Sequence, residues 1–269
     1  MQRKTDKGEC CDLTDNFLLT LSSDLSGSQN ELSNDKRISI NGYQIYACLL
    51  EMLSPETAER LHENIRSPIS QNIVKDKNSG KYIWEINSFD NELSEELSDI
   101  LKVSRTFHAE KADTEFRIES VKRDYIDGFR DIRQRTSALM EQSRIKLDIC
   151  TTAALKKSGE FLLFPDIELI IKNLWKRWND VFPDNPFDDD DALALLLHGV
   201  YISAYDLSSS IYRMKGNDIR GFYGSITIGS RLSPPMKELL CALLYFSQYS
   251  GIGVKTALGM GKTKILLPK

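Results

Sequence analysis

The sequence predicts an α+β protein of two tandem ferredoxin-like (RRM-type) modules, each with the element order β-α-β-β-α-β. The expected strands and helices follow this order twice along 269 residues, and a charged stretch at 127–142 links the two halves. Hydrophobic residues make up 41% of the chain, which suits one large domain or two small ones, each with a core. We therefore expect a flexible N-terminus at residues 1–15, a first module at 16–135 and a second module at 136–269.

Helical spacing and capping residues define the first half. Apolar residues recur at helical spacing between Tyr43 and Leu53. Ser54 and Pro55 then have the residue types preferred at the N-cap and first position of another helix, which we expect to end at His62. In chain order we expect a strand at 17–21, helices at 43–53 and 55–62, strands at 69–74 and 82–86, a helix at 92–103 and a strand at 114–121.

The second half repeats the order without a detectable repeat of sequence. Ile145, Leu147 and Ile149 alternate as they would on one face of a strand. Pro165-Asp166 is typical of a helix start, and a later helix ends at Gly251, the usual residue after a helix. We expect a strand at 144–150, a helix from 166 to 178, strands at 200–205 and 222–228, a helix at 234–249 and a strand at 264–267.

Composition excludes several functional classes. No apolar run approaches the roughly 20 residues of a membrane helix, and no apolar signal core follows Met1. The five cysteines are an odd number without a CxxC pair, which indicates reduced thiols and argues against zinc. We expect the acidic run 188–191 to be a surface loop rather than a metal site. The sequence thus predicts a cytoplasmic protein with no membrane contact, no metal and no cofactor.

Charge is distributed unevenly along the chain. The net charge is −4, yet the segment from Arg231 to Lys269 holds six basic residues against Glu238 alone, or +5. The remainder therefore carries −9, since −9 and +5 give −4. A basic C-terminal patch on an acidic body can still bind a polyanion locally.

A glycine-rich loop lies within this basic segment. Gly251-Ile252-Gly253 and Gly259-Met260-Gly261 bracket five residues, and the interleaved lysines and free N–H groups suit phosphate. The loop is not a P-loop, because Thr256 occupies the first glycine position and no helix follows Thr263. It also follows a helix, whereas a dinucleotide fingerprint follows a strand. The alternative is a glycine-rich hairpin with no ligand.

Several segments of the chain together are typical of one known family. They are 42–50, 58–63, 161–166, 174–179, 221–228, 232–234 and 242–261. Together they resemble the Cas6 family of CRISPR endoribonucleases. The C-terminal stretch is the most specific of them, and the matches lie in order across roughly residues 16–267. The resemblance implies two tandem ferredoxin-like domains and cleavage of CRISPR precursor RNA within its repeats. It also implies metal-free chemistry, in which the ribose 2′-OH attacks the adjacent phosphorus and leaves a 2′,3′-cyclic phosphate and a 5′-OH.

The resemblance also implies which residues carry the chemistry. His62 stands in the segment that resembles the one with the family's catalytic histidine, and histidine suits proton transfer near neutral pH. Tyr46 is the nearer candidate for a tyrosine partner, with Tyr43 one turn earlier, and Arg66 is the candidate for positive charge. Neither tyrosine falls cleanly in the family register, so core packing of both remains an alternative, as does a solvated Arg66. For RNA binding we expect the loop residues Gly251, Gly253, Lys255, Gly259, Gly261 and Lys262.

Three functional hypotheses follow. The first is a metal-independent endoribonuclease specific for CRISPR repeat RNA. The second is a non-catalytic protein that binds repeat RNA. The third is a structural subunit of a guide-RNA effector complex, since related RAMP proteins share the fold and the glycine loop. The sequence leaves the oligomeric state open, with a homodimer among the possibilities.

Overall fold

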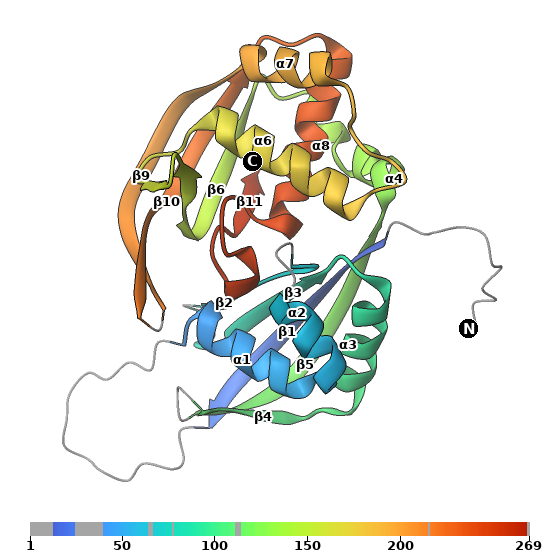
Figure 1. Cartoon of the computed structure of the whole chain (residues 1–269), viewed down its shortest axis with the longest axis vertical. Coiled ribbons are helices and arrows are strands. Elements are labelled where there is room, and N and C mark those ends of the chain that lie inside the picture. Colours follow the sequence, from blue (N-terminus) through green and yellow to red (C-terminus); the bar gives the residue numbers. More distant parts are fainter. Residues whose placement is uncertain are drawn as a thin grey trace, which may run out of the picture.

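The structure, a computed structural model, describes residues 13–24, 40–63, 67–76, 78–110, 114–214 and 216–267. Two antiparallel sheets, one in each half of the chain, carry helices against them (Figure 1). The first sheet uses strands from the N-terminal half and the second uses strands from the C-terminal half. The boundary at 135/136 stays a prediction.

The first sheet has the strand order β2-β3-β1-β5-β4. The order β2-β3-β1-β5 is that of a ferredoxin-like sheet, and β4 is added at one edge as a short strand that the sequence did not predict. The elements in chain order are β1 (Leu13–Asp24), α1 (Gly42–Met52), α2 (Pro55–Glu63), β2 (Ile69–Lys75), β3 (Tyr82–Ser88), α3 (Asn91–Val103), β4 (Thr106–Ala109) and β5 (Thr114–Asp127).

The second sheet has the order β11-β6-β10-β9, which is again ferredoxin-like. The α+β fold of two tandem ferredoxin-like modules is therefore confirmed. Its elements are β6 (Arg144–Ala153), α6 (Ile167–Val181), α7 (Asp190–Gly199), β9 (Val200–Met214), β10 (Asn217–Ser230), α8 (Pro234–Ser250) and β11 (Thr263–Leu266). The additional elements are α4 (Gly128–Arg135), α5 (Ser137–Met140), the β7 (Leu155–Lys157) and β8 (Glu160–Leu162) hairpin, and the 3₁₀ helix η2 (Thr256–Leu258).

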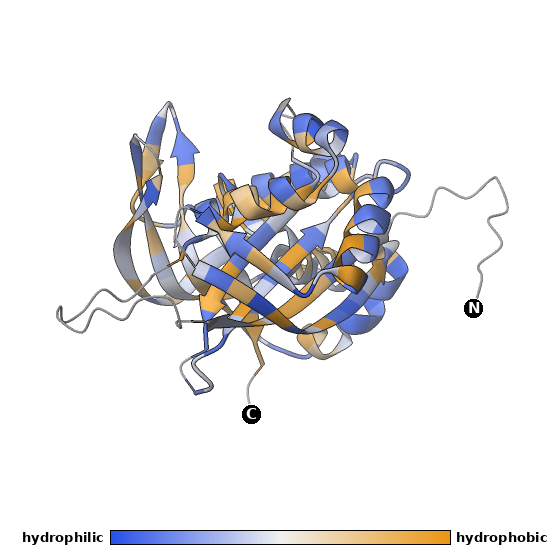
Figure 2. Ribbon diagram, turned by 90° about the horizontal axis from the view of Figure 1, so that it is seen from below, coloured by the Kyte–Doolittle hydropathy of each residue, from blue (hydrophilic) through white to orange (hydrophobic). Residues whose placement is uncertain are grey.

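Each module has its own core. Trp84 is fully buried in the first core, and Trp178 stacks on Phe187 in the second at a centroid distance of 4.5 Å. Figure 2 shows hydrophilic and hydrophobic residues along the same helices and strands, as expected for elements with one buried face. None of the helices within the described residues combines the length and apolar character needed to span a lipid bilayer.

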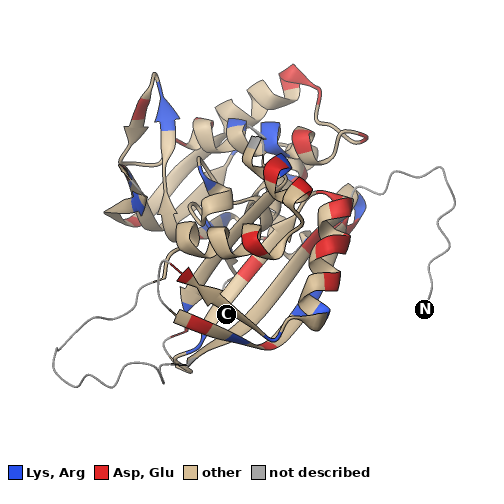
Figure 3. Cartoon of the chain, turned by 60° about the horizontal axis from the view of Figure 1, so that its bottom comes forward, with Lys and Arg blue, Asp and Glu red and all other residues tan. Residues whose placement is uncertain are grey.

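The acidic run at 188–191 is not the surface loop that the sequence predicted. Asp189 is the N-cap of α7, and its side chain accepts a hydrogen bond of 2.9 Å from the amide of Ala192. Asp190 and Asp191 lie in the first helical turn, where the helix dipole favours negative charge. These carboxylates therefore start a helix. Other acidic residues gather along α3, on the first module (Figure 3).

Candidate active site

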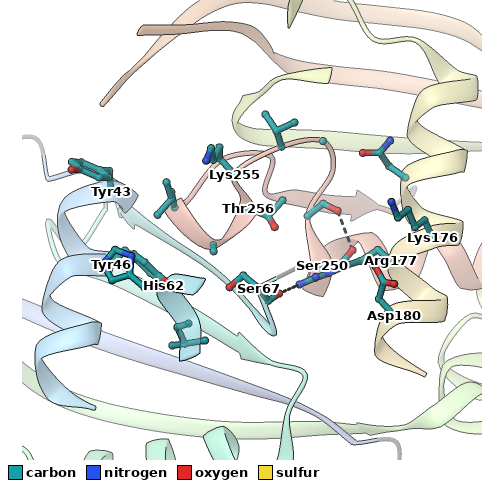
Figure 4. A pocket seen from close by; sticks show the side chains of 17 residues that line it. Tyr43, Tyr46, His62, Ser67, Lys176, Arg177, Asp180, Ser250, Lys255 and Thr256 are labelled. Atoms are coloured by element: carbon teal, nitrogen blue, oxygen red, sulfur yellow. Dashed lines mark hydrogen bonds between the residues drawn. The ribbon is translucent and has the colours of Figure 1, made fainter. Parts of the chain in front are cut away.

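A pocket of about 750 Å³ lies between the two modules. One wall comes from the first module, through Tyr43 and Tyr46 on α1 and His62 on α2. The facing wall comes from the second module, through Lys176 and Arg177 on α6 and the loop that follows α8 (Figure 4). The pocket is large enough to hold a nucleotide-sized ligand.

His62 lies in the last turn of α2 with its side chain exposed in the pocket wall. The preceding residue, Leu61, is buried in the first core and sets the rotation of the helix. Thr57 of the same helix donates a 2.6 Å hydrogen bond to Glu96 on α3, and Arg60 bonds Asp90 at 3.1 Å. These contacts fix α2, so the histidine is held at the pocket while its ring stays accessible.

Tyr46 is buried on the same side of the pocket as His62 (Figure 4). Burial raises the pKa of its phenol above the ordinary value, and the neighbouring Ser67 side chain opposes that rise. The Ser67 hydroxyl oxygen is itself buried, and its geometry makes no hydrogen bond to the described residues. Tyr43 packs partly buried against the long β9–β10 hairpin. Both tyrosines therefore line the pocket and also pack against neighbouring apolar residues.

Arg66, the sequence candidate for positive charge, lies outside the described residues. The chain is described again from Ser67, whose carbonyl accepts a 2.6 Å hydrogen bond from Nη2 of Arg177. Figure 4 shows this bond at the floor of the pocket. The structure thus shows a guanidinium from the second module bonded to the residue that follows Arg66 in the chain.

The glycine loop forms the upper part of the second wall and carries Lys255 into the pocket lining. Lys255 is exposed and has a φ of 60°, the left-handed conformation that non-glycine residues rarely adopt. Such strain in the backbone is frequent at functional positions. Lys255 and Lys176 therefore add two ammonium groups to the lining of the pocket that His62 also lines (Figure 4).

The loop glycines face the protein's own backbone. A Cβ on Gly259 would lie 2.6 Å from Cα of Gly42 at the start of α1. A Cβ on Gly253 would lie 2.3 Å from the carbonyl of Ala154. A Cβ on Gly261 would lie 2.0 Å from the carbonyl oxygen of Ile252, and one on Gly251 would lie 2.9 Å from the Thr256 side chain. Their absent side chains let the loop pack closely against both modules, which is a different reason for glycine from the predicted approach of RNA.

Two polar side chains secure this packing. Gln71 on β2 donates to the carbonyl of Gly42 at 2.7 Å and to that of Ala257 at 3.0 Å. The hydroxyl of Tyr212 on β9 donates to the carbonyl of Leu258 and accepts from the amide of Tyr43 at 2.8 Å. The loop, α1 and the β9–β10 hairpin are therefore held together at the pocket rim.

Lys262, predicted as an RNA contact, does not line the pocket. Its ammonium pairs with Glu85 on β3 and donates to the carbonyl of Gln248 at 2.6 Å. Only 16% of either side chain in the ion pair is exposed. The placement gives no support to the predicted RNA contact, and instead Lys262 joins the second module to the first.

Replacing Lys262 with methionine is expected to destabilise the protein by about 3 kcal/mol, because Glu85 would be left with a largely buried, unpaired charge. Urea unfolding measures the change. Lys102→Met serves as control: Lys102 pairs with Asp99 on the surface, with 67% and 78% of the side chains exposed, and should cost less than about 1 kcal/mol. Adding Glu85→Gln to Lys262→Met should recover part of the loss. Equal effects of the two lysine variants would contradict the structural role.

Sequence reasoning missed Lys176 and Arg177 as pocket residues. Both stand between Trp175 and Trp178, which are buried. This apolar pair indicates a helix packed on the core and gives no sign of a pocket. Helical spacing from Trp178 would have placed Lys176 on the outer face of α6. The packing of the two modules decides which part of this outer face lies against the first module. No local pattern in the sequence predicts that packing.

Comparisons with known proteins agree with this description. A family model described as "CRISPR-associated endoribonuclease Cas6" matches residues 147–263. A Cas6 endoribonuclease of Mycobacterium tuberculosis is 24% identical over 233 residues, covering 85% of this chain and 73% of its own. One from Streptococcus thermophilus is 23% identical over 224 residues, covering 82% of this chain and 90% of its own. A solved Cas6 product complex superposes with a TM-score of 0.74 at 16% identity, covering 95% of this chain and 100% of its own.

The fold and the pocket between its modules define a protein of two tandem ferredoxin-like domains with a candidate site where they meet, and the solved Cas6 structure shares this fold. Within that class, the family match and the two relatives confirm the resemblance to the Cas6 endoribonucleases that the sequence motifs indicated.

Proposed function

We propose that the protein is a metal-independent endoribonuclease that cleaves CRISPR precursor RNA within its repeats to give guide RNAs. The observation that carries the proposal is the pocket between the modules. It is lined by His62, an accessible histidine, and by the cationic side chains of Lys176, Arg177 and Lys255. A proton-transfer group facing positive charge is the arrangement that cleavage of an RNA phosphodiester requires.

The proposed reaction is an internal transfer at one phosphate. The 2′-oxygen bonds to phosphorus as the bond from phosphorus to the 5′-oxygen of the next nucleotide breaks. The 2′-OH loses one proton and the departing oxygen gains one, so the products are a 2′,3′-cyclic phosphate and a 5′-OH. No water is consumed and no electron is transferred. His62 acts in the proton transfers, and the facing cations stabilise the negative charge of the phosphorane.

Tyr46 has a supporting role in this proposal. A tyrosine phenol is protonated at neutral pH, and burial raises the pKa of this one further, so it acts as a hydrogen-bond donor on the His62 side of the pocket. We propose that the protein meets its RNA in the cytoplasm. Assembly into a guide-RNA effector complex or a homodimer stays a prediction, as do the roles of Arg66 and the loop glycines at the RNA.

The test is incubation of the purified protein with repeat RNA from the CRISPR array of its source genome, in buffer containing EDTA. A cut at one position in each repeat is expected, because the chemistry needs only protein groups. A scrambled RNA of the same length is the control and should stay intact. Binding without cleavage would support the non-catalytic RNA-binding hypothesis, and cleavage only after addition of a divalent metal would contradict the mechanism.

A further inference from the structure

We propose that Arg177 binds an RNA phosphate inside the pocket, and thus that the second module supplies a specific phosphate contact close to the cleavage site. This inference rests on the proposed function. It names a residue that neither the sequence motifs nor the comparisons assign. Its support comes from the position of Arg177, from its unusual set of partners and from the chemistry of its guanidinium.

Arg177 is held in place by α6, a helix with a strongly apolar inner face. Ile170, Leu174 and Trp178 on that face are buried in the second core. Arg177 instead reaches across to the first module and lines the pocket on the side opposite His62 (Figure 4). Because its helix is anchored by the core, the guanidinium is fixed at the pocket wall before any ligand arrives, which lowers the ordering cost of binding.

The guanidinium of Arg177 forms no ion pair among the described residues. It donates to the carbonyl of Ser67 and lies over the ring of Phe89, 4.8 Å from the centroid. Burial lowers its pKa to about 10, and the charge of Asp180, which lines the same pocket beside it, opposes that lowering.

Two other arginines of the chain bond carboxylates directly. Arg123 holds Asp15 with two hydrogen bonds of 2.8 and 3.0 Å. Arg135 pairs with both Asp124 and Asp131. Arg177 differs from these two because the group that its guanidinium bonds is a backbone carbonyl at the wall of the pocket.

The guanidinium still has donors to offer. It carries five N–H groups in a planar fork, and the bond to Ser67 uses one of them. The fork matches the oxygens of a phosphate, which it can hold with two parallel bonds. An RNA phosphate in the pocket would give the guanidinium an anion that it bonds directly. Phosphate is favoured over a carboxylate ligand because the same pocket presents Lys176 and Lys255.

The experiment measures RNA binding in proteins that also carry His62→Ala, so that the repeat RNA is not cleaved. Binding is measured between about 50 and 200 mM salt. Arg177→Met is expected to weaken binding about 10- to 100-fold, the loss typical of a charged hydrogen bond. It should also reduce the steepness of log K against log salt by about 0.7, the contribution of one phosphate contact in single-stranded RNA.

Two variants serve as controls. Arg231→Met removes an arginine that lies over a ring, Tyr201, at 5.6 Å from the centroid and outside the pocket lining; it should leave both the affinity and the slope unchanged. Arg177→Lys keeps the charge and loses the fork, so it should keep the slope and weaken binding less than methionine does. Loss of thermal stability in Arg177→Met, with affinity and slope unchanged, would overturn the proposal and leave a purely structural bond to Ser67.

A modified RNA identifies the phosphate even if Arg177→Met fails to fold. Phosphates around the cut are replaced one at a time by neutral methylphosphonates, and each RNA is tested with the Arg177 protein and with Arg177→Lys. At the contacted phosphate, the affinity difference between the two proteins should vanish. A difference that persists at every position would overturn the proposal. These readouts measure binding alone, so a failure to cleave in EDTA would contradict the proposed function separately.

Discussion

Replacing His62 with alanine is expected to lower the single-turnover rate of repeat cleavage by about 10² to 10⁴-fold while leaving RNA affinity within about twofold. The loss reflects removal of the group that transfers protons in the transition state, a contribution of that size in general acid–base catalysis. Affinity should persist because the proposed phosphate contacts are other residues of the pocket, on α6 and the glycine loop. Quenched-flow cleavage and filter binding on the same protein separate the two effects.

His198→Ala is the matched control for this experiment. His198 is also an exposed histidine in the last turn of a helix, α7, and it does not line the pocket. Its replacement should change neither cleavage nor binding. Undiminished cleavage by His62→Ala would exclude His62 as the proton-transfer group. An equal loss of affinity and rate would assign His62 to binding rather than catalysis.

Replacing Gly259 with alanine is expected to destabilise the protein by about 2 to 5 kcal/mol and to lower cleavage as well. Two costs add. Gly259 has a φ of 91°, where a side chain costs about 1 to 2 kcal/mol, and its Cβ would lie 2.6 Å from Cα of Gly42, which forces a backbone shift of similar or greater cost. The shift would separate the loop from α1 and so move Lys255 relative to His62. Urea unfolding and cleavage rates measure the two consequences.

Gly80→Ala isolates the first of these costs. Gly80 has a φ of 71°, and nothing lies within 4 Å of a Cβ placed there. This variant should lose only about 1 to 2 kcal/mol and cleave at the normal rate. If Gly259→Ala and Gly80→Ala were equally stable and equally active, the close approach of the loop to α1 would have no energetic role.

The sequence was most informative where a pattern is local. Helical spacing and the Ser54-Pro55 pair predicted α1 and α2, and hence placed His62 at a helix end. Alternation predicted the strands that form the two sheets. The short edge strand β4 was missed because four residues carry too little periodicity. Helix α7 was missed because its acidic cap was interpreted as a loop.

The site was only partly predictable for a different reason. The resemblance led to His62 and Lys255, which line the same pocket although nearly two hundred residues separate them. Lys262, seven residues from Lys255, turns instead to Glu85, and the difference depends on tertiary contacts alone. The proposed role of Arg177 could not be predicted either, because it depends on α6, in the second module, facing the first module. Local sequence can predict a helix face without showing what that face meets.

The central claim is that RNA is cleaved in the pocket between the modules by attack of its own 2′-OH. The most direct measurement is end-group analysis of the products formed in EDTA, by mass spectrometry of both fragments. The account predicts a 2′,3′-cyclic phosphate on the upstream fragment and a 5′-OH on the downstream one, both lost with His62→Ala. A 3′-OH paired with a 5′-phosphate would contradict it, because that outcome requires water rather than the ribose as the nucleophile.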